Sequence, residues 1–175
     1  TSIQIGCIQT PGERFISWLE MLQHAPQATQ QLPNPFTVRL KNGNYFTPDR
    51  MCGKEGPNGF SHYTIEADKD TESIRYLIRK HDDYTDFYKE RAFTDLWGVH
   101  SMKTLTITTN PMHCHNLTQR LRGRPFVRPF RFKAEPAVAY GLEALDTRYD
   151  GHILTEPFYS IESDESRAVV MRKLD

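Results

Sequence analysis

The sequence is poor in cysteine and contains no long apolar run. It has three cysteines in 175 residues, an odd number without regular spacing, which argues against a disulfide scaffold and for a reducing compartment. No apolar stretch approaches the roughly 18 residues of a membrane span, and no signal peptide is visible. We therefore expect a cytoplasmic protein that does not enter a membrane.

An excess of charge of either sign is also missing. Lysine and arginine together number 22, as do aspartate and glutamate, so the whole chain is not a polybasic nucleic-acid binder. It has no Walker phosphate loop, nucleophile elbow or dinucleotide fingerprint, and no internal repeat. Its length and its ordinary apolar share of 38% fit one globular domain.

The spacing of apolar residues predicts an α/β (α+β) chain with a mixed sheet. Helical spacing predicts helices over residues 13–23, 71–90 and 115–121. Asn42-Gly43 is typical of a hairpin turn, whereas residues 53–59 and 122–136 predict loops or irregular segments. Alternating or β-branched runs predict strands over residues 3–9, 36–40, 45–51, 60–67 and 103–109, with a further strand near 153 or 169.

Three acidic residues lie near the ends of two neighbouring predicted strands. Asp49 belongs to the end of one strand, Glu66 to the end of the next, and Asp68 follows on the same face. Carboxylates brought side by side repel each other and need a cation or a proton between them. Mg²⁺ takes such oxygen ligands, and it can activate water against a phosphate. The alternative is a solvated loop, with a turn at Pro48-Asp49 and helix-start acids after Glu66.

These residues also carry a family resemblance. Pro48-Asp49 followed by Ile65-Glu66-Ala67-Asp68 resembles the core of the PD-(D/E)xK nuclease superfamily. The continuation through residue 73 into a helix bearing Lys80 and Tyr84 resembles the plasmid replication-relaxation proteins and related conjugative relaxases. The resemblance covers roughly residues 3–121.

The resemblance implies a restriction-endonuclease-like mixed sheet flanked by helices over residues 1–121. It implies that Asp49 and Glu66 bind Mg²⁺ or Mn²⁺, and that Glu20 on the first helix is an auxiliary acid. In such proteins this domain follows a winged-helix DNA-binding domain. Because the chain starts at Thr1 within an expected strand, we expect a piece of a longer protein that carries such a domain.

The sequence departs from the family pattern at position 68. The pattern has lysine two residues after the acid, and this chain has Asp68. Either Asp68 is a third metal ligand and a lysine arrives from elsewhere, or the site no longer cleaves. Lys80 on the following helix is our candidate for that lysine, because Lys69 should point to the opposite strand face. The alternative for Lys80 is a solvated helix residue.

A basic segment without acids follows the last predicted helix. Phenylalanines are interleaved with its cations, and the two residue types suit phosphates and unpaired bases respectively. We assign residues 122–175 to a basic arm and an acidic C-terminal extension packed on the core. We expect at least two of the arm's arginines to face the acidic site. The alternative is a structural edge segment whose phenylalanines pack on the core. The candidate DNA-binding residues are Arg122, Arg124, Arg128 and Arg131.

Two other patterns suggest chemistry less directly. Residues 112–115 (Met-His-Cys-His) offer soft metal ligands, with His100 and Cys52 as further candidates, but alternate residues of one segment rarely complete a zinc site. A relaxase acting through a covalent intermediate needs a nucleophilic tyrosine. For Tyr84 and Tyr88, four residues apart on the long helix, we expect packing instead.

Two functions remain. The first is a metal-dependent DNA endonuclease or relaxase-like nicking domain of a plasmid or mobile element. The second is a non-catalytic nuclease-like module that binds DNA or a protein of a plasmid replication or transfer complex. A lysine amine within reach of the Asp49 and Glu66 carboxylates would favour the first.

Overall fold

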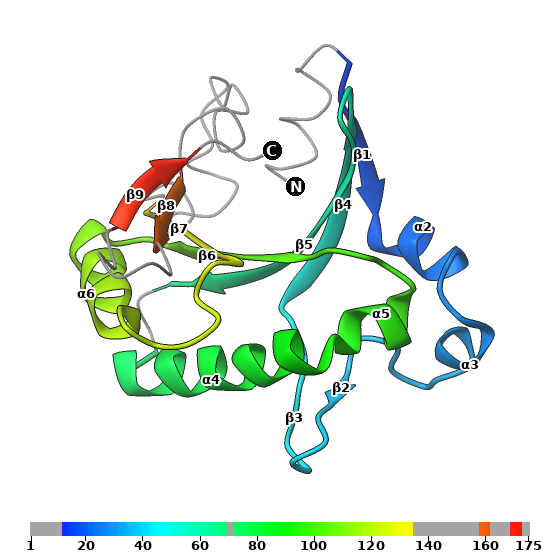
Figure 1. The fold of residues 1–175 in the computed structure, drawn as a ribbon, viewed down its shortest axis with the longest axis horizontal. Coiled ribbons are helices and arrows are strands. Elements are labelled where there is room, and N and C mark those ends of the chain that lie inside the picture. Colours follow the sequence, from blue (N-terminus) through cyan, green and yellow to red (C-terminus); the bar gives the residue numbers. More distant parts are fainter. Residues whose placement is uncertain (1–11, 70–71, 135–157, 162–168, 173–175) are drawn as a thin grey trace.

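The computed structural model describes residues 12–69, 72–134, 158–161 and 169–172. A seven-stranded sheet has the order β1-β4-β5-β6-β7-β8-β9 (Figure 1). Its strands are β1 (Arg14–Ser17), β4 (Arg50–Gly56), β5 (Gly59–Asp68), β6 (Lys103–Thr108), β7 (Phe130–Ala134), β8 (Phe158–Ile161) and β9 (Val169–Arg172). A separate hairpin joins β2 (Val38–Arg39) to β3 (Tyr45–Phe46). The helices are α2 (Trp18–Gln23), α3 (Gln27–Gln30), α4 (Ile74–Glu90), α5 (Ala92–Trp97) and α6 (Pro111–Leu121).

The sheet is mixed because helices connect its central strands. β5, β6 and β7 are parallel, and the other neighbours in the sheet are antiparallel. Parallel neighbours require a crossover, which α4 and α5 supply between β5 and β6 and α6 supplies between β6 and β7. The expectation of a mixed α/β sheet flanked by helices is therefore confirmed.

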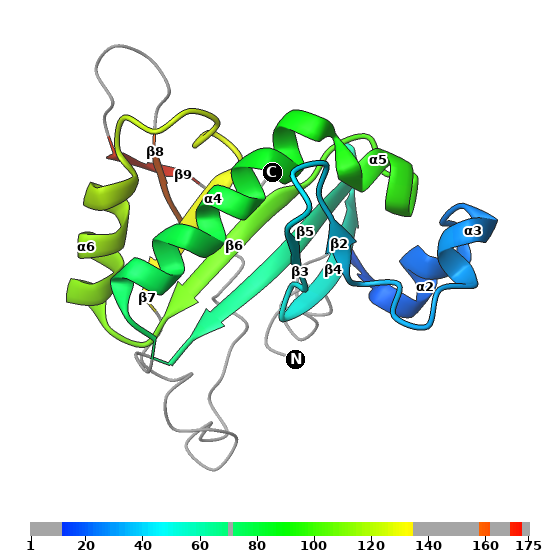
Figure 2. The ribbon, with the colours of Figure 1, turned by 90° about the horizontal axis from the view of Figure 1, so that it is seen from below.

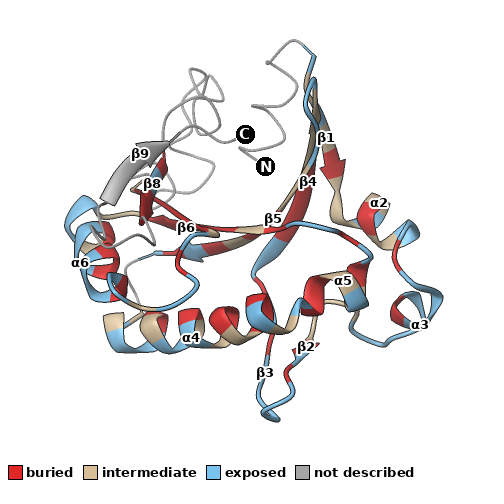
Figure 3. Ribbon diagram, in the orientation of Figure 1, coloured by how far each residue is buried: buried red, intermediate tan, exposed pale blue. Residues whose placement is uncertain are grey.

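Helix α4 lies along one face of the sheet, as seen from below in Figure 2. It starts at the cap residue Ser73, whose side chain accepts a hydrogen bond from Tyr76 N. The side of α4 turned toward the sheet is buried (Figure 3) and carries Leu77, Tyr84 and Phe87. This amphipathic pattern explains why apolar spacing alone predicts the helix.

The central strands bury both of their faces. Along β5, Thr64, Glu66 and Asp68 alternate with Tyr63 and Ile65, which pack with a second apolar cluster. Even positions therefore face α4 and odd positions face the opposite side of the sheet. This alternation brings two carboxylates into the interior between the sheet and the helices.

Several expected elements are confirmed. The structure contains the hairpin turning at Asn42-Gly43, the strand predicted over 60–67, the long helix over 74–90, the strand over 103–108 and a strand at 169–172. The strand predicted over residues 3–9 lies outside the described residues, as does the region near 153. No helix in the described ranges combines the length and apolar character needed to cross a bilayer.

Three local expectations were wrong. The predicted helix over 13–23 begins as strand β1, which pairs with β4. The segment 53–59, expected as a loop, belongs to β4 as far as Gly56 and turns only at 57–58. The segment 122–136, expected to be irregular, contains β7, whose Phe130 and Phe132 are almost fully buried. β1 and β7 pair with strands far away in the sequence, and residues 52–55 of β4 also pair with β1, which local patterns do not encode.

The sheet continues across the boundary expected between 121 and 122. β7 lies between β6 and β8, so residues on both sides of that boundary share one sheet and one core.

Candidate active site

Asp49 and Glu66 are brought together by the β4–β5 hairpin. Arg50 is paired with Ile65 in that hairpin, so the residue before β4 lies beside the end of β5. The backbone N–H of Ala67 donates a hydrogen bond of 2.9 Å to Asp49 Oδ2. Asp49 therefore closes the open end of the hairpin through Oδ2, and its Oδ1 points to the side chain of Lys80.

Lys80 connects the two carboxylates from α4. Its Nζ lies 3.4 Å from Asp49 Oδ1 and forms an ion pair with Glu66 Oε2. Because one ammonium contacts both acids, the two contacting oxygens lie within about 8 Å of each other, which is twice the distance limit of about 4 Å for an ion pair. The expected convergence of Asp49 and Glu66 is therefore present, and Lys80 is not a solvated helix lysine: its side chain is 14% exposed.

Tyr84 holds the other oxygen of Glu66. It lies one helical turn after Lys80, so both side chains reach Glu66 from the same face of α4. Its hydroxyl donates to Glu66 Oε1. Tyr84 and Tyr88 are both buried, and burial raises the pKa of each. The expectation that they pack in the core is confirmed.

Buried polar contacts fix the position of α4 on the sheet. His81, next to Lys80, contacts Thr106 Oγ1 through Nε2 at 3.1 Å, and its Nδ1 lies 2.8 Å from Leu77 O. Burial lowers the pKa of His81 to about 4, so its ring is neutral near pH 7. Tyr88 Oη lies 2.7 Å from Thr104 Oγ1. These contacts define which α4 residues reach the end of β5.

The electrostatics of the cluster are those of carboxylates held away from water. Glu66 is 2% exposed, and burial raises its pKa to about 7. The attraction of Lys80 lowers this pKa, and the repulsion of Asp49 raises it. Burial lowers the pKa of Lys80, but its attraction to Glu66 and Asp49 prevails, so that pKa is raised overall. Near neutral pH the carboxyl of Glu66 is therefore close to its own pKa, whereas the amine of Lys80 remains protonated.

A cavity of about 390 Å³ opens beside this cluster. Asp49 and Lys80 line it, and so does Glu72, which precedes α4. Burial raises the pKa of Glu72, and repulsion from Asp68 and Asp49 adds to this effect while Lys80 opposes it. By its sequence pattern alone, Glu72 is one of the helix-start acids that follow Glu66. Glu72 precedes the cap residue Ser73 and is not part of the helix, so the sequence signal for it is its position just before the helix that carries Tyr76 and Lys80.

Asp68 forms a different contact. It is buried on the same strand face as Glu66, and its Oδ2 lies 3.0 Å from Nε2 of His113 in the first turn of α6. Lys69 is exposed at the end of the strand. Asp68 is thus held by α6, not by Lys80 of α4.

A zinc site at residues 112–115 is not present in the described structure. His113 contacts Asp68, and burial raises the pKa of the Cys114 thiol to about 11. In the described ranges, no three His, Cys, Asp or Glu side chains are arranged to hold a metal ion.

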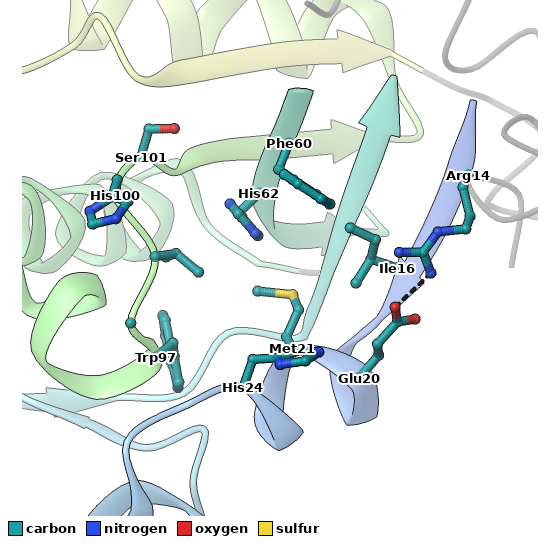
Figure 4. A pocket seen from close by; sticks show the side chains of 12 residues that line it. Arg14, Ile16, Glu20, Met21, His24, Phe60, His62, Trp97, His100 and Ser101 are labelled. Atoms are coloured by element: carbon teal, nitrogen blue, oxygen red, sulfur yellow. Dashed lines mark hydrogen bonds and ion pairs between the residues drawn. The ribbon is translucent and has the colours of Figure 1, made fainter. Parts of the chain in front are cut away.

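Glu20 does not join the acidic cluster, so its expected role as an auxiliary acid was wrong. It lies on α2 and pairs with Arg14 at 2.5 Å (Figure 4). Both residues line a second cavity of about 550 Å³, formed by β1, α2, β5 and the segment after α5. The unexpected strand β1 explains why Glu20 lies away from the acidic cluster, because β1 places α2 at the edge of the sheet beyond β4.

The basic segment is only partly exposed. Arg122 and Arg128 are exposed, and Arg124 forms an ion pair with Asp82 of α4. Arg131 is 7% exposed, and its guanidinium donates to the backbone carbonyls of Arg128 and Phe130. The prediction that Arg131 is an exposed phosphate contact is therefore wrong, because strand β7 places its side chain in the interior.

Comparisons of the chain with protein-family models, curated protein sequences and solved structures find no match.

Proposed function

We propose that this chain is a metal-dependent DNA endonuclease or relaxase-like nicking domain that hydrolyses a phosphodiester. The observation that carries the proposal is the position of Lys80 Nζ against both Asp49 and Glu66. A lysine beside paired carboxylates supplies a positive group where negative charge develops during phosphate cleavage. The β4–β5 hairpin, the α4 crossover and the parallel strand β6 support a restriction-endonuclease-like core.

The residues of the cluster fit a hard divalent cation. Asp49 and Glu66 offer carboxylate oxygens, the ligands that Mg²⁺ and Mn²⁺ prefer, and Glu72 lies on the cavity wall. Burial raises the pKa of Glu66 and of Glu72, so a bound cation would favour the charged form of both carboxyl groups. Asp49, whose side chain is 42% exposed, makes the cluster accessible from the cavity. A bound cation would supply an activated water and neutralise the charge on the phosphate.

The protein's own groups would position the reaction. The Ala67 N–H fixes one oxygen of Asp49, and the Tyr84 hydroxyl fixes one oxygen of Glu66. One oxygen of each carboxylate is therefore held in place before a cation binds. Lys80 would leave its pairing with Glu66 and direct its ammonium to a phosphate oxygen. Asp68, held by His113, would support the strand end and not act as a ligand.

A non-catalytic DNA- or protein-binding module is the second candidate. It is favoured by the pairing of both Glu66 oxygens with Lys80 and Tyr84 and by the lack of a three-ligand group among the described residues. In that case the buried ion pair is structural. Both candidates would act with plasmid replication or transfer proteins.

A nicking assay separates the two candidates. Supercoiled plasmid is incubated with the purified chain and Mg²⁺ or Mn²⁺, and relaxed or linear product is quantified. We expect product with the wild type and none with Asp49→Asn or Glu66→Gln. Asp95→Asn, which changes an exposed carboxylate on α5, is the matched control. Absence of metal-dependent product from the folded wild type, or equal product from Glu66→Gln, would reject hydrolysis at this site.

A further inference from the structure

Two tyrosines are exposed beside the candidate active site. Tyr45 on β3 is 74% exposed and Tyr76 on α4 is 52% exposed. Both line the cavity that Asp49 and Lys80 also line. Single exposed aromatic residues are common on protein surfaces. A pair on two different elements facing one charged cavity indicates a binding surface.

The hairpin that carries Tyr45 is fixed to α4. Asn44 Nδ2 donates to Asp83 Oδ1 at 3.1 Å, and Asn42 Nδ2 donates to Asp86 Oδ2 at 3.0 Å. Figures 1 and 2 both show this hairpin lying against α4. Tyr45 is therefore presented on an ordered element, so that binding through it loses little conformational entropy.

Strand alternation turns Tyr45 outward. Its neighbour Phe46 is buried, with its ring centroid 4.6 Å from that of Tyr84. Successive side chains of a strand point to opposite sides, so Phe46 anchors the hairpin in the core and leaves Tyr45 at the cavity. The outward position of the ring thus follows from the packing of the hairpin.

Helix α4 adds a cation to the same surface. Tyr76, Arg79 and Lys80 are spaced to lie on one helical face, and all three line the cavity. Arg79 is exposed, and no ion pair among the described residues involves it. A guanidinium binds phosphate oxygens, while a tyrosine ring offers a face on which an unpaired base stacks.

We propose that Tyr45 and Tyr76 form a stacking surface for unpaired nucleotides, with Arg79 as a phosphate contact. The substrate of the candidate active site is then single-stranded DNA, or a strand with unpaired bases at the cleavage point. This inference rests on the proposed nuclease function, because it names the substrate class of the same site. Paired bases are stacked inside a duplex and do not expose their faces to protein rings, so an intact duplex leaves both tyrosines unused.

The test is a binding titration that does not depend on cleavage. A fluorescent single-stranded oligothymidylate and a blunt duplex of the same length are titrated with the chain in Ca²⁺, a hard cation that takes oxygen ligands. Tyr45→Ala and Tyr76→Ala are compared with Tyr45→Phe and Tyr76→Phe, which retain the ring. Phe60→Ala is the matched control, because Phe60 is 58% exposed but lines the second cavity. Thermal denaturation establishes that each variant is folded.

We expect the single strand to bind more tightly than the duplex. Each alanine variant should weaken single-strand binding on the order of tenfold, whereas the phenylalanine variants and Phe60→Ala should stay within about twofold of the wild type. Equal or tighter duplex binding overturns the inference. So does single-strand binding that either alanine variant leaves unchanged, or that Phe60→Ala weakens equally.

The two proposals fail in different ways. Tyrosine-dependent single-strand binding without cleavage of any DNA rejects the hydrolytic function and leaves the stacking surface standing. Metal-dependent cleavage of intact duplex that is unchanged in both alanine variants supports the hydrolytic function and rejects the stacking surface.

Discussion

Replacing Glu66 by glutamine should make the free energy of unfolding larger relative to the wild type at alkaline pH than at acidic pH. Glu66 is 2% exposed, and its pKa in the fold is about 7, against an ordinary value of 4.5. Between these values the unfolded chain loses the proton and the folded chain retains it. The unfolded state then binds fewer protons, so the free energy of unfolding falls as pH rises. Below pH 4.5 both states are protonated and the effect vanishes.

The magnitude follows from the same pKa values. At about 1.4 kcal/mol per tenfold change, ionising Glu66 in the fold costs about 3 kcal/mol above pH 7. Part of this cost is already present near pH 5. Glutamine keeps a similar shape and does not ionise. The stability difference between Glu66→Gln and the wild type should therefore become more favourable by about 2–3 kcal/mol between about pH 5 and about pH 8.5.

Urea denaturation at the two pH values measures this difference. A chelator is included so that no cation compensates Glu66. The control is Asp95→Asn, an exposed carboxylate whose replacement should change little with pH. A pH-dependent difference under about 0.5 kcal/mol, or one of opposite sign, would refute the reasoning. Lys80 would then compensate the charge of Glu66 fully, and the cluster would have no need of a cation.

Three further predictions concern other parts of the molecule. Mg²⁺ at about 100 times its dissociation constant should raise the free energy of unfolding by about 2.7 kcal/mol, and Asp49→Asn should abolish this in thermal denaturation; equal stabilisation of both would place the cation elsewhere. Gly53→Ala should destabilise by about 1–3 kcal/mol, because its new Cβ would lie 3.1 Å from Ile16 Cβ; Gly56→Ala, with open space around it, is the control in urea denaturation, and equal effects would contradict the packing argument. Arg128→Ala should reduce the slope of the logarithm of the DNA-binding constant against the logarithm of salt concentration by about one. An unchanged slope would show that this exposed arginine does not contact a phosphate.

The sequence alone determined those features that depend on neighbours along the chain. The Asn42-Gly43 hairpin, the amphipathic helix α4 and the β-branched strand β6 follow from local spacing and turn chemistry. The proximity of Asp49 to Glu66 belongs to this group only in part. Neighbouring strands are predicted at both residues, but their register is fixed by a short turn at 57–58 that the sequence pattern does not predict. Lys80 could be proposed since it lies on the next element, but its reach depends on how α4 packs.

Only the tertiary structure decided which distant segments pair and which charges they bring together. β1 and β7 are strands because they bond to β4 and β6, and those bonds form between residues far apart in sequence. For the same reason Arg131 is buried in the sheet, Glu20 lies at another cavity, and Asp68 meets His113 and not Lys80. A periodic pattern shows which face of an element is apolar. The partner of that face is chosen by the packing of the whole chain.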